Sequence, residues 1–389
     1  MIDEKRLKEN LTTFSFPRLS GTDGEKKALK LARSKVEDLN QDPLSQTFVF
    51  STFFGRVYPK IAFVSGFTIL FLLFINVITI IIPISLAFIA MLMVVLLLLT
   101  RKPENIRIKN KLNSENLYVK IRAKHNERDN GKEERKMGNI LFMCHLDSKG
   151  QRFSILGRVR IIRTWVFSWI ILVFILIFRN YLLPSLYVQL HVLGIVVLGV
   201  NLIATILFLL NTTNDESIGA IDNSSGIAIV LELLNHYTNL ESRLENFNLW
   251  FVFTGAEECG TMGIRNFDYI ISGVNKKQSF FFNFDAIARN LYLFPGKKRS
   301  KQVETIFEMF LKNKKGIEIK RNPKKIYFGT FSDGYYLKKK KFYGIGIGDL
   351  ESYEYIHSIH DTVDKVDVPL LKKLCEMIID NLIALDNQT

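Results

Sequence analysis

Two long uncharged stretches constrain this 389-residue chain more than any other feature of its sequence. Residues 61–100 contain no Asp, Glu, Lys or Arg, and neither do residues 180–214, which follow a shorter apolar run at 164–178. A helix needs roughly 20 apolar residues to cross the ~30 Å hydrocarbon core of a membrane. We therefore predict four transmembrane helices in two hairpins, residues 61–100 and 161–210. The alternative, buried core helices of a soluble protein, is disfavoured because such cores seldom contain uninterrupted apolar runs of this length.

The distribution of lysine and arginine predicts the orientation of these hairpins. Both residue types are frequent before Ile61, between Arg101 and Arg163, and after Asp215, whereas the turn near Pro83 has neither. Cytoplasmic loops of membrane proteins are enriched in these residues. We expect a multi-pass protein of the cell membrane whose N-terminus, C-terminus and polar domain are cytoplasmic. The polar first sixty residues do not resemble a cleavable signal peptide.

The formal net charge of +14 has two explanations. A basic stretch between residues 297 and 341 either is attracted to anionic lipid headgroups of the bilayer or is a solvated surface without a partner. No nucleic-acid-binding signature is present, so nucleic acid is not an expected partner. The three cysteines have neither disulfide-like nor zinc-knuckle spacing, which is typical of a reducing compartment.

The polar segments alternate between strand-like and helix-like patterns. Short apolar runs that end at a polar residue or a glycine predict strands at 138–145, 246–254, 279–285 and 342–348. Helical patterns cover 24–39, 224–237, 301–311 and 369–385. This alternation predicts an α/β fold with a mixed, mostly parallel central sheet flanked by helices. This domain would be assembled from residues 1–60, 101–160 and 211–389, which the two hairpins separate in the sequence.

Acidic and imidazole side chains stand where several predicted strands end. His145 closes the first strand, Glu257 and Glu258 follow the second, and Asp285 closes the third. Ligands of such sheets gather at the carboxyl ends of the strands, so these side chains are expected to converge on one site. Adjacent Glu257 and Glu258 repel one another, and a bound cation would relieve that repulsion. Two exposed loop glutamates are the simpler interpretation of the pair.

Three further residues complete the candidate site, and each alone has an ordinary structural interpretation. Asp222, in the segment GAIDNSSG ahead of a helical pattern, fits a helix N-cap as well as a carboxylate that bridges two metal ions. Asp147 shares a strand face with the histidine two residues before it, and is near enough to orient that imidazole. His357 by itself would be a solvated loop histidine.

Together these segments resemble the di-zinc aminopeptidases, family twenty-eight of the metallopeptidases, whose relatives include glutamate carboxypeptidase and glutaminyl cyclase. The resemblance lies in the order His-x-Asp, Gly-x-x-Asp-Asn-x-Ser-Gly, Glu-Glu-x-Gly, Asn-x-Asp and His-Ser-x-x-Asp-Thr. The segment Arg18-Leu19-Ser20-Gly21-Thr22 looks like the family's N-terminal Arg-x-x-Gly-Ser, with Thr22 in place of Ser. Phe331-Ser332-Asp333-Gly334 is similar to its Ser-Asp-His segment, with Gly334 in place of His. That departure puts some substrate contacts in doubt.

The resemblance implies a zinc-dependent metallopeptidase that holds two zinc ions and hydrolyses peptides. Glu257 would be the general base, and Asp147, the other catalytic candidate, would orient the imidazole of His145. His360 competes with His357 for the last ligand position, and His357 is preferred because Asp361 follows it by four residues, as in the family. The two ions would be held by five ligands, of which Asp222 bridges both: His145, Asp222, Glu258, Asp285 and His357.

The hairpins bear on the substrate, because they interrupt the chain on both sides of His145. We expect the site to lie near the bilayer and to receive peptides delivered at or from the membrane. Two alternatives are a glutaminyl cyclase and a non-catalytic membrane receptor or scaffold. The presence of all five ligand segments and Glu257 favours hydrolysis over both.

Overall fold

The computed structural model describes residues 1–76, 91, 102–106, 108, 111–125, 138–296, 300–312, 315–321 and 332–388. The chain divides into two compact units. The first, here called the sheet unit, comprises residues 1–50, 112–150 and 214–389. The second, the helical unit, comprises residues 51–111 and 151–213. Each unit is therefore assembled from segments that are distant in sequence.

An eight-stranded sheet forms the centre of the sheet unit, in the order β1-β2-β6-β3-β7-β10-β8-β9. The pairs β6–β3, β3–β7, β7–β10 and β8–β9 are parallel, and β2–β6 and β10–β8 are antiparallel. The prediction of a mixed, mostly parallel sheet is confirmed. The strands are β1 (Leu44–Ser51), β2 (Lys111–Ile121), β3 (Gly138–His145), β6 (Phe247–Thr254), β7 (Phe280–Phe284), β8 (Leu291–Phe294), β9 (Ile319–Arg321) and β10 (Tyr343–Gly348).

The central strands are continuous apolar runs because both of their faces are covered. Every residue of β3, β6 and β7 is buried, as is typical of parallel strands between helix layers. Phe142 lies with its ring centroid 5.2 Å from that of Phe251 and 5.7 Å from that of Phe282, one residue from each strand. The ring of Tyr237 covers Phe142 from the helix layer, at 6.3 Å.

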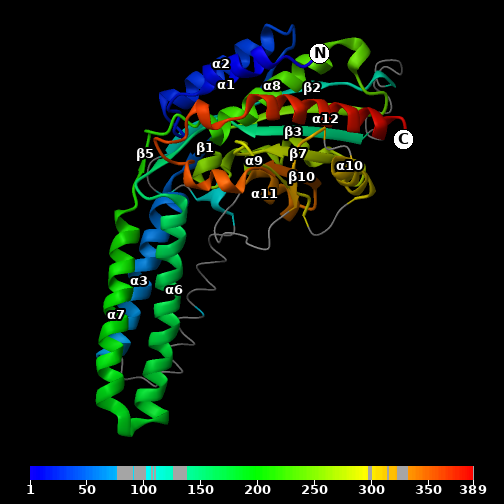
Figure 1. Cartoon of the computed structure of the whole chain (residues 1–389). Helices are drawn as coiled ribbons and strands as arrows, with labels where there is room; N and C mark the ends of the chain where they lie inside the picture. The colour runs from blue at the N-terminus through cyan, green and yellow to red at the C-terminus, as the bar shows by residue number, and fades with distance from the viewer. Residues whose placement is uncertain are drawn as a thin grey trace. The chain divides into compact units, whose positions relative to one another are not determined.

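Helices cover both faces of this sheet, and Figure 1 shows α1, α8 and α12 on one side and α9 and α11 on the other. The second face is packed by Ile264 and Phe267 of α9 and Leu337 of α11 against Leu141 and Phe281 of the sheet. The helices of the sheet unit are α1 (Glu4–Phe14), α2 (Asp23–Glu37), α8 (Ser225–Thr238), α9 (Met262–Phe267), α10 (Lys301–Lys312), α11 (Asp333–Lys339) and α12 (Val368–Asp386).

All four predicted strands and all four predicted helices are present, with ends that differ from the predictions by at most two residues. The prediction missed four strands of the sheet, which are β1, β2, β8 and β9. These strands lie toward the two edges of the sheet, where β1 and β2 alternate between exposed and buried residues. Strands with an open face carry polar residues there, so β1 and β2 lack the continuous apolar pattern that identified the central strands. The strand β8 is largely buried but spans only 4 residues.

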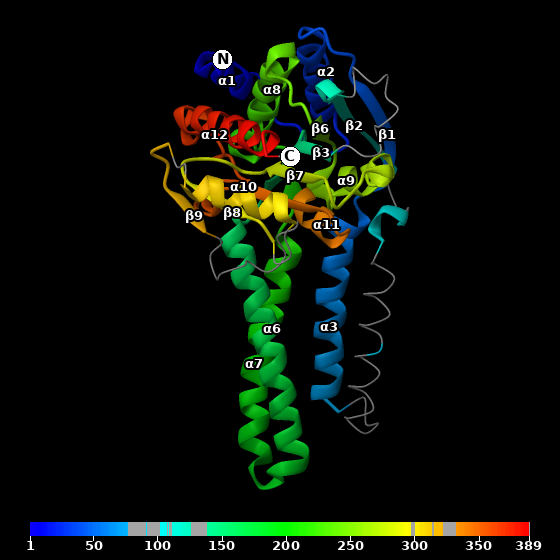
Figure 2. The same cartoon turned by 90° about the vertical axis from the view of Figure 1, so that its right-hand side faces the viewer.

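The helical unit contains three long apolar helices, α3 (Tyr58–Phe74), α6 (Ile155–Ile177) and α7 (Tyr187–Leu210). With the short turns joined to them, these helices span Phe53–Phe74, Ile155–Leu182 and Pro184–Leu210, and each is long and apolar enough to cross a membrane. Figure 2 shows α6 and α7 as a hairpin with α3 beside it. The second crossing expected within residues 61–100 falls mostly on residues outside the described part of the chain.

Close packing and internal polar contacts join the three helices. Leu70 and Leu73 of α3 form one buried cluster with Leu172 and Leu176 of α6. Gly194 of α7 lets α3 approach, since a Cβ atom there would lie 2.4 Å from the ring of Phe74.

A small polar network links α6 and α7. Asn201 Nδ2 donates to the Ser168 hydroxyl at 2.8 Å and to the Trp165 carbonyl at 3.0 Å. The Trp165 indole donates to the Thr205 hydroxyl at 3.0 Å. Hydrogen bonds of this kind hold helices together where no water is available.

Candidate metal centre

The carboxyl ends of three parallel strands bring the candidate residues together. His145 is the last residue of β3 and pairs in register with Thr254, the last residue of β6. Glu257 and Glu258 begin the short helix η7 (Glu257–Cys259) just beyond β6, and Asp285 follows β7 directly. The convergence expected from the sequence is therefore present in the fold.

Two groups of potential metal ligands share one carboxylate. The first group contains His145, Asp222 and Asp285, and the second contains Asp222, Glu258 and His357. Within each group the nearest ligand atoms of the residues lie within 4.8 Å of one another. Asp222 directs Oδ1 toward His145 Nε2 at 3.0 Å and Oδ2 toward His357 Nε2 at 3.2 Å. Its two oxygens thus face different histidines, as a bridging carboxylate requires.

Two of these carboxylate oxygens have imidazole nitrogens as their near polar neighbours. Asp222 Oδ1 and Glu258 Oε1 are buried and have no hydrogen-bond partner among the described residues, although His145 Nε2 and His357 Nε2 lie only 3.0 and 2.9 Å away. Buried polar atoms are rarely left without a partner. The nitrogen and oxygen atoms of each group lie within 4.8 Å of one another, close enough for one cation to bind them together. Imidazole nitrogens and carboxylate oxygens are donors that zinc accepts, so this set of residues fits a pair of zinc ions.

His145 is held in the tautomer that a metal ligand needs. Its Nδ1 atom lies 3.0 Å from the backbone carbonyl oxygen of Asp147, which can only accept a hydrogen bond. Nδ1 therefore carries the proton, and the lone pair of Nε2 is directed toward Asp222 and Asp285.

Asp147 also fixes the glutamate pair. Its Oδ1 atom accepts a hydrogen bond from the Glu257 amide, and its Oδ2 atom accepts one from the Glu258 amide, both at 3.0 Å. The Ser20 hydroxyl donates to Oδ2 at 2.5 Å. Asp147 thus lies behind the candidate ligands and positions both the imidazole of His145 and the backbone that carries Glu257.

The electrostatics of the centre reflect an excess of acidic groups. Burial alone would raise the pKa of Asp222, but its contacts with His145 and His357 outweigh burial and hold the pKa below its usual range. Burial likewise opposes ionisation of Glu258, and the charges of His357 and Lys149 nevertheless lower its pKa to about 2. Lys149 Nζ contacts Glu258 Oε2 at 2.5 Å. These two carboxylates are ionised and available to a cation.

Glu257 has the opposite character. Burial is the largest effect on this carboxyl and raises its pKa well above the usual range, with a further increase from the neighbouring charge of Glu258. It belongs to neither ligand group, although it adjoins Glu258. A carboxyl group in such a position can hold a proton, which is what general acid–base chemistry requires.

Two loops are fixed beside Asp222. The Asp361 carboxylate accepts hydrogen bonds from the amides of Ile221 at 2.5 Å and Asp222 at 3.3 Å. Burial raises the pKa of Asp361 to about 7. The Asn223 side chain donates to the carbonyl oxygen of Phe284 at 2.8 Å, which ties the loop of Asp222 to the end of β7 next to Asp285.

The N-terminal segment holds all of these loops, a role that the sequence did not reveal. The buried Arg18 guanidinium donates to the carbonyl oxygens of Leu146 at 2.7 Å, Ile218 at 2.7 Å and Gly219 at 3.0 Å. It therefore joins the loop of His145 to the loop of Asp222. Gly219 has a positive φ of 59°, and a Cβ atom there would lie 3.0 Å from this guanidinium.

Glu25 completes this arrangement from the first turn of α2. Its Oε1 atom accepts hydrogen bonds from the Ala256 amide and from the Ser114 hydroxyl, both at 2.8 Å, and its Oε2 atom accepts one from the Gly21 amide at 2.6 Å. Together with Asp147, it orders three successive amides ahead of and within the glutamate pair. No local signal in the sequence distinguishes this glutamate from an ordinary residue at a helix start.

The remaining candidate residues differ in how close they lie to the two ligand groups. His357 lies in the second ligand group, whereas His360 is exposed and belongs to neither group. Asp333 is buried near the centre, where the Thr254 hydroxyl donates to it at 2.5 Å and burial raises its pKa to about 7. Gly334 packs against β7, and a Cβ atom there would lie 3.0 Å from that of Asn283. Ligand and catalytic roles for the seven predicted residues stay predictions that this geometry supports.

Solved structures of several peptidases share this fold. The aminopeptidase of Aneurinibacillus sp. strain AM-1 matches with a TM-score of 0.54 and 11% identity, over 98% of this chain and 93% of that one. The zinc aminopeptidase BSAP of Bacillus subtilis matches with a TM-score of 0.53 and 12% identity, over 98% and 95%. Glutaminyl cyclase of Fimbriiglobus ruber matches with a TM-score of 0.54 and 12% identity, over 98% and 94%. At this level of identity the matches establish the fold.

The family follows from a separate comparison. No curated protein matches the sequence of this chain. Residues 196–382, however, match the sequence model of a protein family, Peptidase family M28. This segment contains Asp222, Glu257, Glu258, Asp285 and His357, and the fold adds His145 to them from β3. The family that this chain matches, over residues 196–382, is therefore peptidase family M28.

Proposed function

We propose that this protein is a membrane-anchored aminopeptidase-type hydrolase that uses two zinc ions to cleave peptides at the cytoplasmic face of the membrane. The observation that carries the proposal is the position of Asp222, whose two oxygens serve two separate groups of ligand side chains. A single metal site would need only one of these groups. The family assignment supports peptide hydrolysis as the reaction.

Zinc, when bound, would supply Lewis acidity that polarises the peptide carbonyl and makes a water molecule more acidic. His145 and Asp285 would hold one ion, Glu258 and His357 the other, and Asp222 both. Glu257 would accept a proton from the attacking water on its carboxylate and later deliver it to the leaving amine. Nearby cations would lower the raised pKa of Glu257, so that its carboxylate is free to act as the base.

Glu257 must be held still for this role, and the chain provides the means. Asp147 fixes the amide of Glu257, and Glu25 fixes the amide of the preceding residue, Ala256. Ala256 adopts a left-handed conformation with φ of 49°, which turns the chain from β6 into η7. This turn directs the glutamate pair back over the ends of the strands.

The membrane location of the substrate is supported by chain connectivity. The chain leaves the sheet unit after Gly150, five residues beyond His145. It enters this unit again at Asn214, eight residues before Asp222. The polypeptide between them forms α6 and α7, which are apolar enough to span a bilayer. Two candidate ligands are thus covalently tethered to these helices, which favours peptides delivered at or from the membrane. Detergent-solubilised enzyme that cleaves free dipeptides as fast as membrane-associated peptides would contradict this part of the proposal.

Zinc content and activity of matched variants test the central claim. The purified protein should contain two zinc ions per chain and hydrolyse members of an aminoacyl fluorogenic panel. Glu257→Gln should retain both ions and lose about 10²- to 10⁴-fold in activity, because it removes only the proton acceptor. Glu37→Gln, the same chemical change at an exposed position of α2, should leave activity unchanged. A protein without zinc in its active form, or Glu257→Gln with full activity, would refute the mechanism.

Glutaminyl cyclization is the second candidate, because a solved glutaminyl cyclase shares the fold. The presence of two complete ligand groups around Asp222 favours hydrolysis. Incubation of the zinc-loaded protein with peptides that begin with glutamine separates the two reactions: cyclization retains peptide length, whereas hydrolysis shortens it. Zinc-loaded protein inactive in both assays would favour the remaining alternative, a non-catalytic receptor or scaffold.

A further inference from the structure

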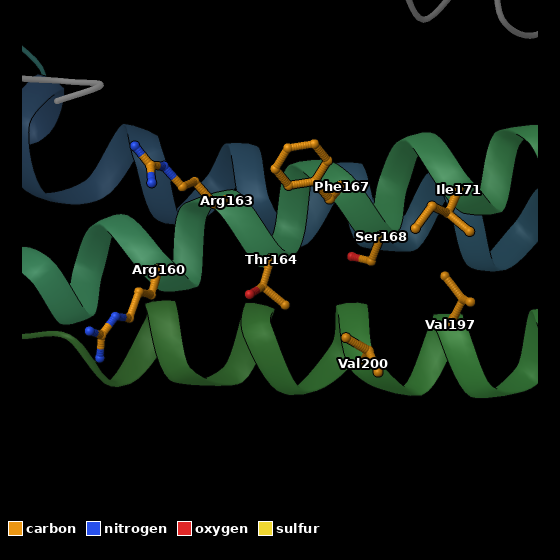
Figure 3. A pocket seen from close by; sticks show the side chains of 8 residues that line it. All are labelled: Arg160, Arg163, Thr164, Phe167, Ser168, Ile171, Val197 and Val200. Carbon is orange, nitrogen blue, oxygen red and sulfur yellow. The ribbon is translucent and has the colours of Figure 1, made fainter. Parts of the chain in front are cut away.

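A groove with a volume of about 450 Å³ runs along α6 and α7 in the helical unit, and its lining includes none of the candidate metal ligands. Figure 3 shows Arg160, Arg163 and Thr164 toward one end of the groove and Ile171 and Val197 toward the other. Its volume lies within the range of small-molecule and lipid-chain sites. The groove therefore has a charged end and an apolar end.

The charged end lies in the first part of α6, which contains no charged residue after Arg163. Arg160 and Arg163 are three residues apart on α6, so they occupy neighbouring positions on its surface. Both side chains are exposed, and neither forms an ion pair with an acidic residue of the described part of the chain. Arginine in a membrane helix is costly unless it meets an anion or reaches the headgroup region. The exposed hydroxyl of Thr164 lies next to them and adds a neutral donor.

The remainder of the groove offers an apolar surface. Phe167 is 63% exposed and Ile171 is 48% exposed on α6, and Val200 is 42% exposed on α7. The Ser168 hydroxyl beneath them donates to the Trp165 carbonyl and accepts from Asn201, so it is already satisfied. An occupant of this part gains nothing from polarity and is best matched by a hydrocarbon chain.

We propose that this groove binds one anionic phospholipid. The phosphate would lie between Arg160 and Arg163, whose guanidinium groups are suited to recognise phosphate oxygens. One acyl chain would lie along Phe167, Ile171 and Val200. This inference depends on α6 crossing a membrane but not on the metal centre or on peptide hydrolysis.

The position of the two arginines in the sequence also favours an anionic phospholipid. Arg160 follows the end of the sheet-unit segment at Gly150 by ten residues, so the charged end of the groove is on the side from which α6 enters the bilayer. With the sheet unit cytoplasmic, as proposed, this is the leaflet in which anionic lipids attract basic side chains.

Lipid retention by the purified full-length protein tests the proposal. The protein in detergent is mixed with phosphatidylglycerol or with phosphatidylcholine of the same acyl chains, and bound lipid is counted by native mass spectrometry. The wild type should retain phosphatidylglycerol in preference to phosphatidylcholine. Arg160→Gln combined with Arg163→Gln should reduce that preference by about thirtyfold, from the usual contribution of a basic residue near an anionic surface. Replacement of both arginines by lysine should preserve most of it.

Two controls separate this groove from general attraction to basic surfaces. Arg152→Gln removes an exposed arginine of the helical unit that does not line the groove, and should leave the preference unchanged. Val200→Trp should fill the apolar end and reduce retention of the lipid while both arginines remain. Inorganic phosphate at millimolar concentration should not displace the lipid, because it lacks the chain.

The proposal is overturned if the wild type retains both lipids equally, or if Arg152→Gln lowers the preference as much as the double variant. It is also overturned if inorganic phosphate competes fully or if Val200→Trp retains lipid like the wild type. Size-exclusion chromatography and thermal unfolding show whether each variant is folded. A misfolded double glutamine variant is replaced by the two single variants, each expected to cause part of the loss.

Discussion

The two units bury charge in opposite ways. In the sheet unit, the acidic groups of Asp222, Glu258 and Asp285 gather around two histidines, and some buried oxygens remain without a hydrogen-bond partner. In the helical unit, the fully buried Arg179 is surrounded by neutral groups. It donates to the Phe74 carbonyl, to Asn76 and to Asn180.

This difference shows what each unit requires. Arg179 also lies 2.9 Å from His191 Nδ1 and 5.0 Å from the centre of the Phe74 ring, so its surroundings are complete without another molecule. Buried charges are tolerated only when they are paired or well hydrogen-bonded. The acidic cluster of the sheet unit supports the proposed binding of metal cations, whereas the buried Arg179 of the helical unit is satisfied by groups of its own chain.

Removal of zinc should therefore separate the two units. At free zinc of about a thousand times its dissociation constant, bound metal contributes about 4 kcal/mol to the stability of the folded state. Chelation should lower the hydrogen-exchange protection of β3, β6 and α8 by an effect of this size. Protection in α6 and α7 should not change. Equal loss of protection in both units would contradict the difference between them.

Substitution of Glu25 tests whether activity depends on the exact positions of Glu257 and Glu258. Glu25→Ala should lower kcat by about 10- to 100-fold with little change in KM, because the Ala256 amide loses its acceptor and the glutamate pair is displaced. Glu25→Gln keeps an acceptor oxygen and should restore part of the activity. Zinc content should stay at the wild-type level in both variants. Loss of zinc or of folding in Glu25→Gln would assign this residue a structural role instead.

Arg179 tests the helical unit in the same manner. Arg179→Gln should destabilise the packing of α3 against α6 and α7 by about 1–3 kcal/mol, because buried acceptors such as the Phe74 carbonyl lose their donor. Hydrogen exchange of α3 should become faster. Zinc affinity of the sheet unit should be unchanged, and a change there would show that the units are energetically coupled.

The stability of the metal-free protein should depend on pH through two histidines of the sheet unit. Burial alone would lower the pKa of His145 and His357, but contacts with acidic groups outweigh it and raise both values above their usual range. In the metal-free protein, the stabilisation from these imidazolium groups is complete below the unfolded-state pKa of about 6.5 and is lost as the pH rises through the raised values. Metal-free protein should thus become less stable above about pH 6.5.

Zinc reverses this dependence, because it binds histidines only after they lose their protons. Zinc affinity should increase from pH 6 to pH 8, and calorimetry in buffers of different ionisation enthalpy should show proton release on binding. Binding without proton release would mean that the histidines are already neutral, against the direction of their pKa shifts.

The sequence predicted the parts of the site that depend on strand ends. His145, Glu257, Glu258 and Asp285 follow apolar runs that had to be central strands, and parallel strands align their carboxyl ends. The choice of His357 over His360 came from a resemblance in spacing, and the ligand group in the structure contains His357.

Other features could not be predicted, because they depend on contacts between remote segments. Glu25 contacts Ala256 across 231 residues, and Arg18 contacts Gly219 across 201. The resemblance singled out the segment of Arg18 but not its contacts, and nothing in the local pattern distinguishes Glu25 from an ordinary glutamate at a helix start. The strands β1 and β2 were missed because polar residues on an open face weaken the apolar pattern, whereas β8 and β9 span only 4 and 3 residues.

The sequence alone therefore determined the apolar segments, the central strands and the types of ligand atoms available, because these depend on composition and on the periodicity of neighbouring residues. The resemblance implied a bridging role for Asp222, but only the tertiary structure decided that its oxygens lie in two candidate ligand groups, and that Arg18 and Glu25 hold the loops around them. A bridging carboxylate is defined by the directions of its two oxygens. Those directions are set by packing between segments that the chain brings together only when it folds.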